Sequence, residues 1–147
     1  MDFKKLANQY RDELLDNVLP FWLEHSQDIE FGGYFSCLDR EGKVFDTDKF
    51  IWLQGREVWM FSMLYNKVEK RQEWLDCAVQ GGEFLKKYGH DGNYNWYFSL
   101  DRSGRPLVEP YNIFSYTFAT MAFGQLSLAT GNQEYVGHSK KELRRSF

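Results

Sequence analysis

The sequence has few of the features that mark secreted, membrane-spanning or metal-binding proteins. It contains only two cysteines, Cys37 and Cys77, which form no CxxC pair and have no histidine cluster beside them. We therefore expect two buried free thiols and no zinc site. No apolar run approaches eighteen residues, and the N-terminus lacks the apolar segment of a signal peptide. These absences predict a soluble, cytoplasmic protein that does not act at a membrane.

The sequence also lacks an excess of basic residues. Its formal net charge is −3, with acidic and basic residues interspersed, which argues against a nucleic-acid or anionic-lipid surface. What it has in plenty is aromatic residues, at 18% of 147 residues, and 43% hydrophobic residues overall. This composition is sufficient for one domain with an aromatic core, or for a pocket that stacks flat rings as sugar sites do.

Apolar residues recur at helical spacing in four segments. We expect helices over residues 3–19, 50–67, 72–88 and 112–130, with Pro20 stopping or bending the first and Gly131 closing the last. Glycine- and turn-rich stretches between them predict two β-hairpins. The residues Asp46, Thr47 and Asp48 are N-cap candidates for the second helix. The Gly81-Gly82 pair lies within the third helix and predicts close approach of another helix.

The chain contains an internal repeat. The segment LDREGK at 38–43 recurs as LDRSGR at 100–105, and each copy follows an aromatic strand and precedes a long apolar helix. A period of about 60 residues with two helices per unit is typical of an α-solenoid or a closed α/α toroid. We therefore predict an all-α fold with short β-hairpin insertions, and a chain too short to close a ring of such units.

The same offset of 62 isolates one unusual residue. In the segment FIWLQGREVWMFSMLY, Trp52 corresponds to Phe114 and Trp59 corresponds to Met121, so apolar positions repeat as apolar. Arg56 instead corresponds to Phe118. A break of this kind in local consistency is where a functional site is expected.

Two interpretations of Arg56 stay open at this point. Trp52, Arg56, Trp59 and Met63 form one stripe of a helix, which could line a cavity with two indoles for sugar rings and a guanidinium for oxygens. The alternative is a structural arginine paired with a buried carboxylate. Neighbouring Gln54 and Glu57 fit either case, as partners that position the site or as solvated groups.

Other candidate residues carry weaker signals. The single histidines His25 and His90 are more often surface or core residues than catalytic bases. Two pairs of loop acids could form a glycosidase pair but are more often helix caps: Asp28 with Glu30, and Asp46 with Asp48. The sequence has no Ser-His-Asp pattern and no glycine-rich phosphate loop.

A long segment resembles a known family. The stretch FWLEHSQDIEFGGYFSCLDREGKVFDTDKFIWLQGREVWMFSMLY is similar to the N-terminal part of N-acylglucosamine 2-epimerases, the group that includes the renin-binding protein. GGEFL, LDRSGRP and IFSYTFATMAFGQLSLATG continue the similarity in order, from about residue 10 to about 135. The match to cellobiose 2-epimerases and aldose–ketose isomerases is less close.

The resemblance implies an (α/α)6 barrel of six helical hairpins, of which this chain would form an incomplete part. It also implies interconversion of N-acetylglucosamine and N-acetylmannosamine by removal and return of the C2 proton through an enolate. Arg56 matches the arginine of the family's Q-x-R motif and would be catalytic, because it stabilises the developing charge. We expect Trp52, Gln54 and Trp59 to bind substrate with it.

The resemblance further implies an amino-sugar substrate and no cofactor or metal for the chemistry, with ATP as an allosteric effector in the full-length family. The alternative functions are a cellobiose 2-epimerase, an aldose–ketose isomerase, or a non-catalytic partial barrel that binds a sugar or a protein. Residues 1–135 would form the N-terminal part of the barrel.

Residues 136–147 look like a divergent basic tail without the expected amphipathic helix, which suggests a truncated or frameshifted reading frame. The proton-transferring histidines of the family would lie beyond residue 147, and His138 does not match them. The 147-residue chain is therefore expected to be inactive. Exposed helix faces would also favour a homo-oligomer.

Overall fold

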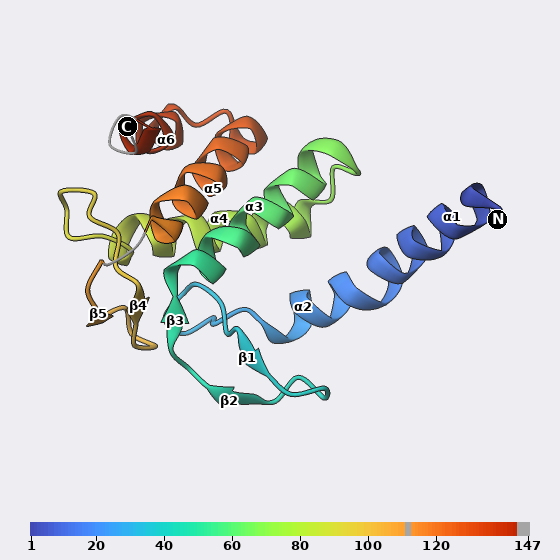
Figure 1. Ribbon diagram of the computed structural model, residues 1–147, viewed down its shortest axis with the longest axis horizontal. Coiled ribbons are helices and arrows are strands. Elements are labelled where there is room, and N and C mark those ends of the chain that lie inside the picture. The colour runs from blue at the N-terminus through green and yellow to red at the C-terminus, as the bar shows by residue number, and fades with distance from the viewer. Residues whose placement is uncertain (111–112, 144–147) are drawn as a thin grey trace.

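The computed structural model describes residues 1–110 and 113–143, the last four of these by their backbone alone. Five helical rods and two short sheets make up this part of the chain (Figure 1). The helical elements are α1 (Phe3–Glu13), the π-helical turn η1 (Leu14–Val18), α2 (Leu19–His25), α3 (Ile51–Lys67), α4 (Gln72–Tyr88), α5 (Phe114–Thr130) and α6 (Gln133–Leu143).

The centre of the molecule is the packing of α3 against both α4 and α5, with α6 on the far side of α5 (Figure 1). α3 and α5 occupy equivalent places in the repeat, and each is 17 residues long. Their inward faces meet in one core that includes Val58, Phe61, Ala119 and Phe123, all fully buried. The predicted helix-rich architecture with hairpin insertions is confirmed. It forms because each helix buries its stripe of apolar residues against the next helix.

Two antiparallel sheets carry the predicted hairpins. β1 (Cys37–Leu38) pairs with β2 (Val44–Asp46), and β4 (Ser99–Leu100) pairs with β5 (Pro106–Val108). An additional strand, β3 (Lys49–Phe50), lies directly before α3 and pairs with β4. β3 therefore connects the first repeat to the hairpin of the second, a contact that the sequence pattern did not predict.

The N-cap prediction for α3 was wrong. The residue before α3 is Phe50, which makes no side-chain cap, because β3 separates the acidic candidates from the helix start. The first N–H of α3, on Ile51, instead donates to the carbonyl of Phe98 at 3.0 Å, so the neighbouring hairpin satisfies it. Asp46 lies in β2 and accepts a hydrogen bond from the N–H of Asp48.

The prediction that Pro20 stops the first helix at residue 19 was also wrong. Helical backbone continues from α1 through η1 into α2 as far as His25. Before the proline, the N–H of Leu19 donates to the carbonyl of Leu14, five residues back. This π-type bond shifts the helical hydrogen-bonding pattern by one residue. Pro20, which has no N–H, therefore lies in the first turn of α2, where a helix needs no backbone N–H donor.

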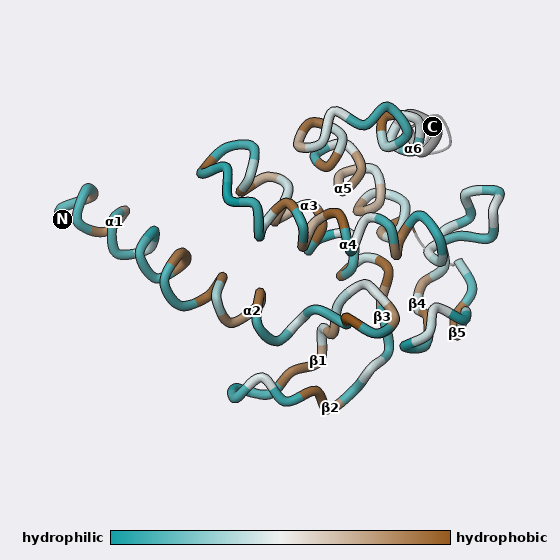
Figure 2. Tube along the Cα trace, turned by 180° about the vertical axis from the view of Figure 1, so that it is seen from behind, coloured by the Kyte–Doolittle hydropathy of each residue, from teal (hydrophilic) through white to brown (hydrophobic). Residues whose placement is uncertain are grey.

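The helix α1 stands apart from the core. It contains no buried residue, and Phe3 and Tyr10 are 75% and 71% exposed. Figure 2 shows its alternating hydrophilic and apolar turns on an arm that extends away from the other helices. No helix in the described part of the chain is both long and apolar enough to cross a membrane.

The glycine pair in α4 allows close packing, as predicted, but against two different partners. A Cβ atom on Gly82 would collide with a methyl group of Leu126 on α5, which confirms a close helix–helix approach. A Cβ atom on Gly81 would collide with the ring of Tyr34, which belongs to the loop after α2. Both residues of the pair therefore face groups that leave no room for a side chain.

The end of α5 is as predicted, but a helix follows it where none was expected. Gly131 adopts a left-handed conformation with a φ of 71° and closes α5. Residues 136–147 were expected to lack a helix, whereas α6 runs from Gln133 to Leu143 and packs on α5. The last part of this stretch, 144–147, lies outside the described residues. Tyr135 and His138 bury their rings against Phe123 of α5. This packing explains why the segment forms a helix. The domain division at residue 135 stays a prediction.

Candidate functional site

The predicted stripe of α3 faces away from the core. Trp52, Trp59 and Met63 are partly exposed and Arg56 is exposed, whereas the opposite face of the helix is buried. Gly55, beside Arg56 on the buried side, has no room for a side chain, because the backbone of Phe118 would lie 2.9 Å from its Cβ atom. α3 can therefore pack tightly on α5 and still present a polar group at its outer edge.

A pocket of about 390 Å³ opens around Arg56, and we call it the Arg56 pocket. Its walls come from α2, the loop that follows, and α3, and they combine aromatic, aliphatic and hydrogen-bonding side chains: Trp22, Ser36, Leu53, Arg56, Glu57, Trp59 and Met60. Indole faces beside a guanidinium and hydroxyl groups suit a polyhydroxylated ligand, which has apolar ring faces and a rim of oxygens.

A smaller, apolar pocket of about 280 Å³ lies next along the helix, and we call it the Trp52 pocket. It is lined by Trp52, Phe98, Phe114 and Phe118. The Phe118 ring contacts both sites, since its centroid lies 6.0 Å from that of Trp52 and 5.7 Å from the Arg56 guanidinium carbon. Thus Arg56 and its repeat counterpart, Phe118, are in contact, and Phe118 supplies an aromatic face to the cation.

The structural alternative for Arg56 is not supported. In residues 1–110 and 113–143, no carboxylate forms an ion pair with the Arg56 guanidinium, and its side chain is not buried. Among the described residues, the guanidinium contacts the ring of Phe118. Its hydrogen-bond donors are therefore available to a ligand in the Arg56 pocket.

Gln54 does not join this group. Its side chain is fully buried on the opposite face of α3, where Oε1 accepts from the Tyr34 N–H and Nε2 donates to the Tyr34 carbonyl, both at 2.8 Å. The Tyr34 hydroxyl in turn donates to the Cys77 carbonyl of α4 at 2.8 Å. The predicted direct contact between Gln54 and a sugar is not supported by this geometry. Gln54 instead fixes the loop after α2 to α3.

Glu57 is the acidic member of the Arg56 pocket. Its Oε1 lies 2.5 Å from the hydroxyl of Ser26, the fully buried residue at the C-terminal end of α2. Burial raises the pKa of Glu57 to about 8, although the hydrogen bond with Ser26 opposes this shift. The pocket therefore contains an acid whose neutral form is favoured by burial, next in the chain to a permanent cation.

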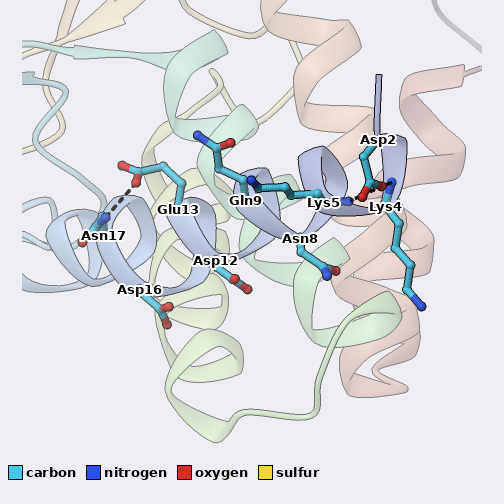
Figure 3. Close-up of a pocket in the computed structure, with 9 residues that line it drawn as sticks. All are labelled: Asp2, Lys4, Lys5, Asn8, Gln9, Asp12, Glu13, Asp16 and Asn17. Atoms are coloured by element: carbon cyan, nitrogen blue, oxygen red, sulfur yellow. Dashed lines mark hydrogen bonds between the residues drawn. The ribbon is translucent and has the colours of Figure 1, made fainter.

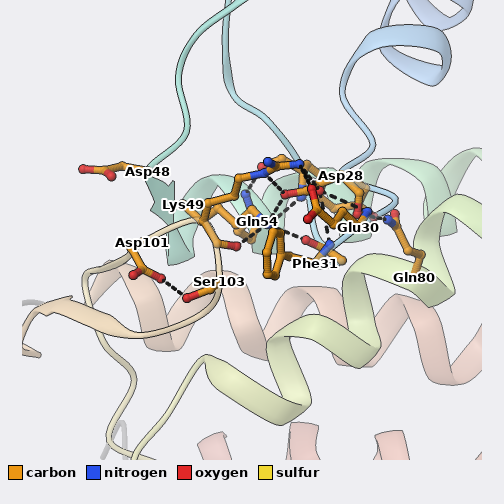
Figure 4. A network of polar contacts seen from close by, with 12 residues as sticks. Asp28, Glu30, Phe31, Asp48, Lys49, Gln54, Gln80, Asp101 and Ser103 are labelled. Carbon is orange, nitrogen blue, oxygen red and sulfur yellow. Dashed lines mark hydrogen bonds and ion pairs between the residues drawn. The ribbon is translucent and has the colours of Figure 1, made fainter.

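A second charged group joins the loop after α2, the strand β3 and the turn between β4 and β5 (Figure 4). We call it the Asp28 cluster. The buried ammonium of Lys49 donates to Asp28 at 2.9 Å, to the Gly32 carbonyl at 2.6 Å and to the Arg102 carbonyl at 2.9 Å. Arg102 binds both carboxylate oxygens of Asp28, at 2.9 and 3.0 Å. All three donors of the Lys49 ammonium are therefore in use, and the cluster joins both repeats.

The geometry of the Asp28 cluster does not support a glycosidase pair of Asp28 and Glu30. Burial opposes ionisation of Asp28, but hydrogen bonds from Arg102 and Lys49 outweigh it and lower the pKa of this carboxyl. Arg102 also pairs with Glu30 at 3.0 Å. A carboxyl held ionised and saturated in this way cannot supply the proton that a glycosidase acid gives. Asp46 and Asp48 line neither pocket.

The histidines lie elsewhere. His25 packs on Phe21 and against the turn at Gly42, and the Nδ1 atom of His90 accepts from the Gly92 N–H at 3.0 Å. Neither lines the Arg56 pocket.

Both free cysteines are present as predicted, Cys77 buried and Cys37 partly so. Within the described ranges no group of three or more His, Cys, Asp or Glu residues could hold a metal ion.

The surface also has a polar hollow along the arm, shown in Figure 3. Every residue that lines it comes from the chain start, α1 or η1, among them Asp2, Lys5, Asp12 and Asn17. One helical rod supplies the whole lining, so the hollow has no opposing wall to enclose a ligand. We do not consider it a candidate site.

Comparisons with known proteins identify the family. A family model described as N-acylglucosamine 2-epimerase (GlcNAc 2-epimerase) matches residues 33–145. The chain belongs to this family. N-acylglucosamine 2-epimerases from Mus musculus and Homo sapiens are each 47% identical to it, over 84% and 82% of this chain. Those stretches are 30% and 29% of the relatives, so the chain spans less than a third of their length.

Solved structures in the family confirm the fold. A cellobiose 2-epimerase from Bacillus thermoamylovorans superposes with a TM-score of 0.87 at 28% identity, covering 96% of this chain and 36% of that one. A sugar epimerase from a ruminal bacterium gives a TM-score of 0.86 at 27% identity, covering 95% and 36%. These proteins are (α/α)6 barrels, and the chain has the fold of part of one.

Sequence reasoning missed two features of the site. It considered Glu57 only as a possible partner and did not connect it with Ser26, 31 residues earlier. It also missed the pairing of Lys49 and Arg102 with Asp28. A signal for the second existed, because Arg102 lies in the second copy of the repeat at the position of Arg40 in the first.

Proposed function

We propose that the chain is the substrate-binding part of an N-acylglucosamine 2-epimerase, which interconverts N-acetylglucosamine and N-acetylmannosamine. The observation that carries this proposal is the Arg56 pocket, in which a guanidinium that has no ion pair with the described residues lies among indole rings. The greater identity to N-acylglucosamine 2-epimerases, 47% against 28% for a cellobiose 2-epimerase from Bacteroides fragilis, favours an amino-sugar substrate over a disaccharide.

The chemistry of C2 epimerisation explains the need for an arginine. The C2 proton of the open-chain sugar is acidic only because the electrons can move onto the C1 oxygen and form an enolate. A guanidinium stabilises this oxygen as its negative charge grows, and it remains charged throughout because it has no accessible neutral form. In the proposal, Arg56 supplies this charge, and Trp59 packs on the apolar face of the sugar.

A complete reaction also needs proton-transferring groups on both faces of the sugar. Neither His25 nor His90 lines the Arg56 pocket, and Glu57 is one acid rather than two opposed groups. We therefore propose that the 147-residue chain binds the sugar without turnover. A non-catalytic sugar-binding module is the second candidate function, favoured by this same observation. No cofactor is needed for the chemistry, and ATP would be an effector only.

The proposal is tested by measuring binding and turnover separately. Saturation-transfer NMR with N-acetylglucosamine should show contacts to the chain, and Arg56→Ala should remove them, while Arg40→Ala, which replaces an exposed arginine, should not. Incubation with N-acetylmannosamine in D2O should give no enzyme-dependent exchange at C2. The absence of sugar binding would refute the assignment of the pocket. Exchange at an ordinary enzymatic rate would show that the chain contains its own bases.

A further inference from the structure

The Trp52 pocket is built from equivalent positions of the two repeats. Trp52 of α3 corresponds to Phe114 of α5 at the offset of 62, and both line the pocket. Phe118, the counterpart of Arg56, lines it as well. Phe98, which precedes β4, supplies a further wall. The stripe that carries Arg56 in the first repeat therefore meets an aromatic stripe of the second repeat at this place.

The wall from the second hairpin is held by its backbone and by its ring. The N–H of Phe98 donates to the carbonyl of Val108 at 3.0 Å, and its carbonyl accepts from the N–H of Ile51 at 3.0 Å. The Phe98 ring meets the Phe50 ring edge-on, with 5.6 Å between their centroids. The pocket is therefore formed by the fold itself, as ligand sites usually are.

The chemistry of the walls restricts which part of a ligand can enter. Apart from the indole N–H of Trp52, none of the described side chains that line the pocket carries a hydrogen-bonding group. A sugar hydroxyl placed there would lose its water without gaining enough partners, which costs free energy. An alkyl group has no hydrogen bonds to lose and is stabilised by burial against aromatic rings. The pocket therefore suits the alkyl end of an acyl group.

The distance from Arg56 fits the position of such a group on the sugar. In the proposed function Arg56 binds the oxygen on C1, and the acylamino group is attached to C2, the next carbon. The methyl carbon lies about 3.8 Å from C2, because the amide linkage has the geometry of a peptide bond. The centroid of the Phe118 ring, a wall of the Trp52 pocket, lies 5.7 Å from the guanidinium carbon. A sugar held at C1 by Arg56 can therefore place its acyl methyl group against this ring.

We propose that the Trp52 pocket is the subsite for the acyl group of the amino sugar, and that Phe114 and Phe118 determine the preference for an acylated substrate. The orientation of the sugar rests on the proposed function, whereas the affinity of the pocket for an acyl amide does not. Because a volume of about 280 Å³ is larger than a methyl group needs, acyl chains longer than acetyl should also fit.

The first measurement uses sugars that differ by one carbon in the acyl group. N-formyl-, N-acetyl- and N-propanoylglucosamine are titrated into the chain by calorimetry. Each added carbon should raise the wild-type affinity about fourfold, the value for burying one methylene group. Phe114→Ala removes a wall whose side chain is 62% exposed, so the fold should persist while each step falls to about twofold or less.

The matched control is Leu128→Ala. Leu128 lies on the same helix, is 70% exposed and does not line the Trp52 pocket. This variant should keep the wild-type step between the sugars. Steps of the same size in wild type and Phe114→Ala, or equal affinities of the three sugars, would overturn the subsite and leave the proposed function standing.

The second measurement tests the acyl group without a sugar. N-methyltrifluoroacetamide is the probe, and its fluorine NMR signal broadens when it binds. Wild type and Leu128→Ala should broaden the signal, and Phe114→Ala should broaden it less. If no sugar binds, the proposed function fails and this probe alone decides the subsite. In that case the expected pattern supports the subsite, and equal broadening by all three proteins, or none, would overturn it.

Discussion

The Asp28 cluster and the Arg56 pocket both hold an arginine near an acid, yet the two regions use charge in opposite ways. In the Asp28 cluster a buried carboxylate binds two cations, and every donor of Lys49 is in use. In the Arg56 pocket burial raises the pKa of the acid, and the cation has no carboxylate partner in the described residues. A saturated charge stabilises the fold, whereas an unsaturated charge beside a cavity is available to bind a ligand.

The largest effect should come from removing the central carboxylate of the Asp28 cluster. Replacing Asp28 with Asn leaves the ammonium of Lys49 buried without its anion, so we expect the free energy of unfolding to fall by about 3–5 kcal/mol. The control Asp12→Asn removes an exposed ion pair with Arg11 and should change stability by less than about 1 kcal/mol. Urea unfolding measures both. Equal stabilities of the two variants would show that the Asp28 cluster contributes no more than a surface pair.

The next largest effect should come from a substitution in the Arg56 pocket. We expect Arg56→Ala to weaken N-acetylglucosamine binding about tenfold or more, since a charged hydrogen bond contributes about 1.5–3 kcal/mol. It should leave the free energy of unfolding nearly unchanged, because the side chain is exposed and forms no ion pair with any residue that the structure describes. Calorimetric titration and urea unfolding separate the two quantities. A large loss of stability would mean that Arg56 stabilises the fold, as the residues of the Asp28 cluster do.

The repeat offers a comparison of two arginines in the same local sequence. Arg102→Ala removes the bidentate contact with Asp28 and should cost about 1.5–3 kcal/mol of stability. Arg40→Ala, at the equivalent position of the first repeat, should change it by less than about 0.5 kcal/mol because its side chain is exposed. Thermal or urea unfolding checks the difference. Similar costs would show that local sequence, rather than the contact with Asp28, decides the effect.

The smallest effect is a difference in pH dependence. Glu57 binds its proton more tightly in the folded chain than in the unfolded chain, so the free energy of unfolding should fall as the pH rises from about 4.5 to about 8. The variant Glu57→Gln should lack this fall and gain about 1–3 kcal/mol relative to wild type above pH 8.

The Asp28 carboxyl predicts the opposite sign. Its pKa is lowered in the folded chain, so its contribution is present above the unfolded value and is lost as the pH falls through the folded one. Unfolding measured against pH for wild type, Asp28→Asn and Glu57→Gln therefore distinguishes the two carboxyls. An alkaline fall in stability that persists in Glu57→Gln would assign it to another group.

Much of the fold could be predicted because it depends on local periodicity. The expected ranges for α3, α4 and α5 agree with the structure to within one or two residues at each end, and Gly131 closes α5 as its conformational freedom predicts. The errors fall where a distant contact replaces a local signal. The hairpin carbonyl of Phe98 replaces a side-chain cap on α3, and a change of helical register accommodates Pro20.

The sequence by itself determined that α3 carries a charge where its repeat carries an apolar residue, and its similarity identifies an epimerase family. The tertiary structure alone decided which charges are satisfied. Asp28, Lys49 and Arg102 meet across 74 residues, and Ser26 reaches Glu57 across 31. Protonation and pairing depend on burial and on groups brought together through space, and no short-range pattern encodes either.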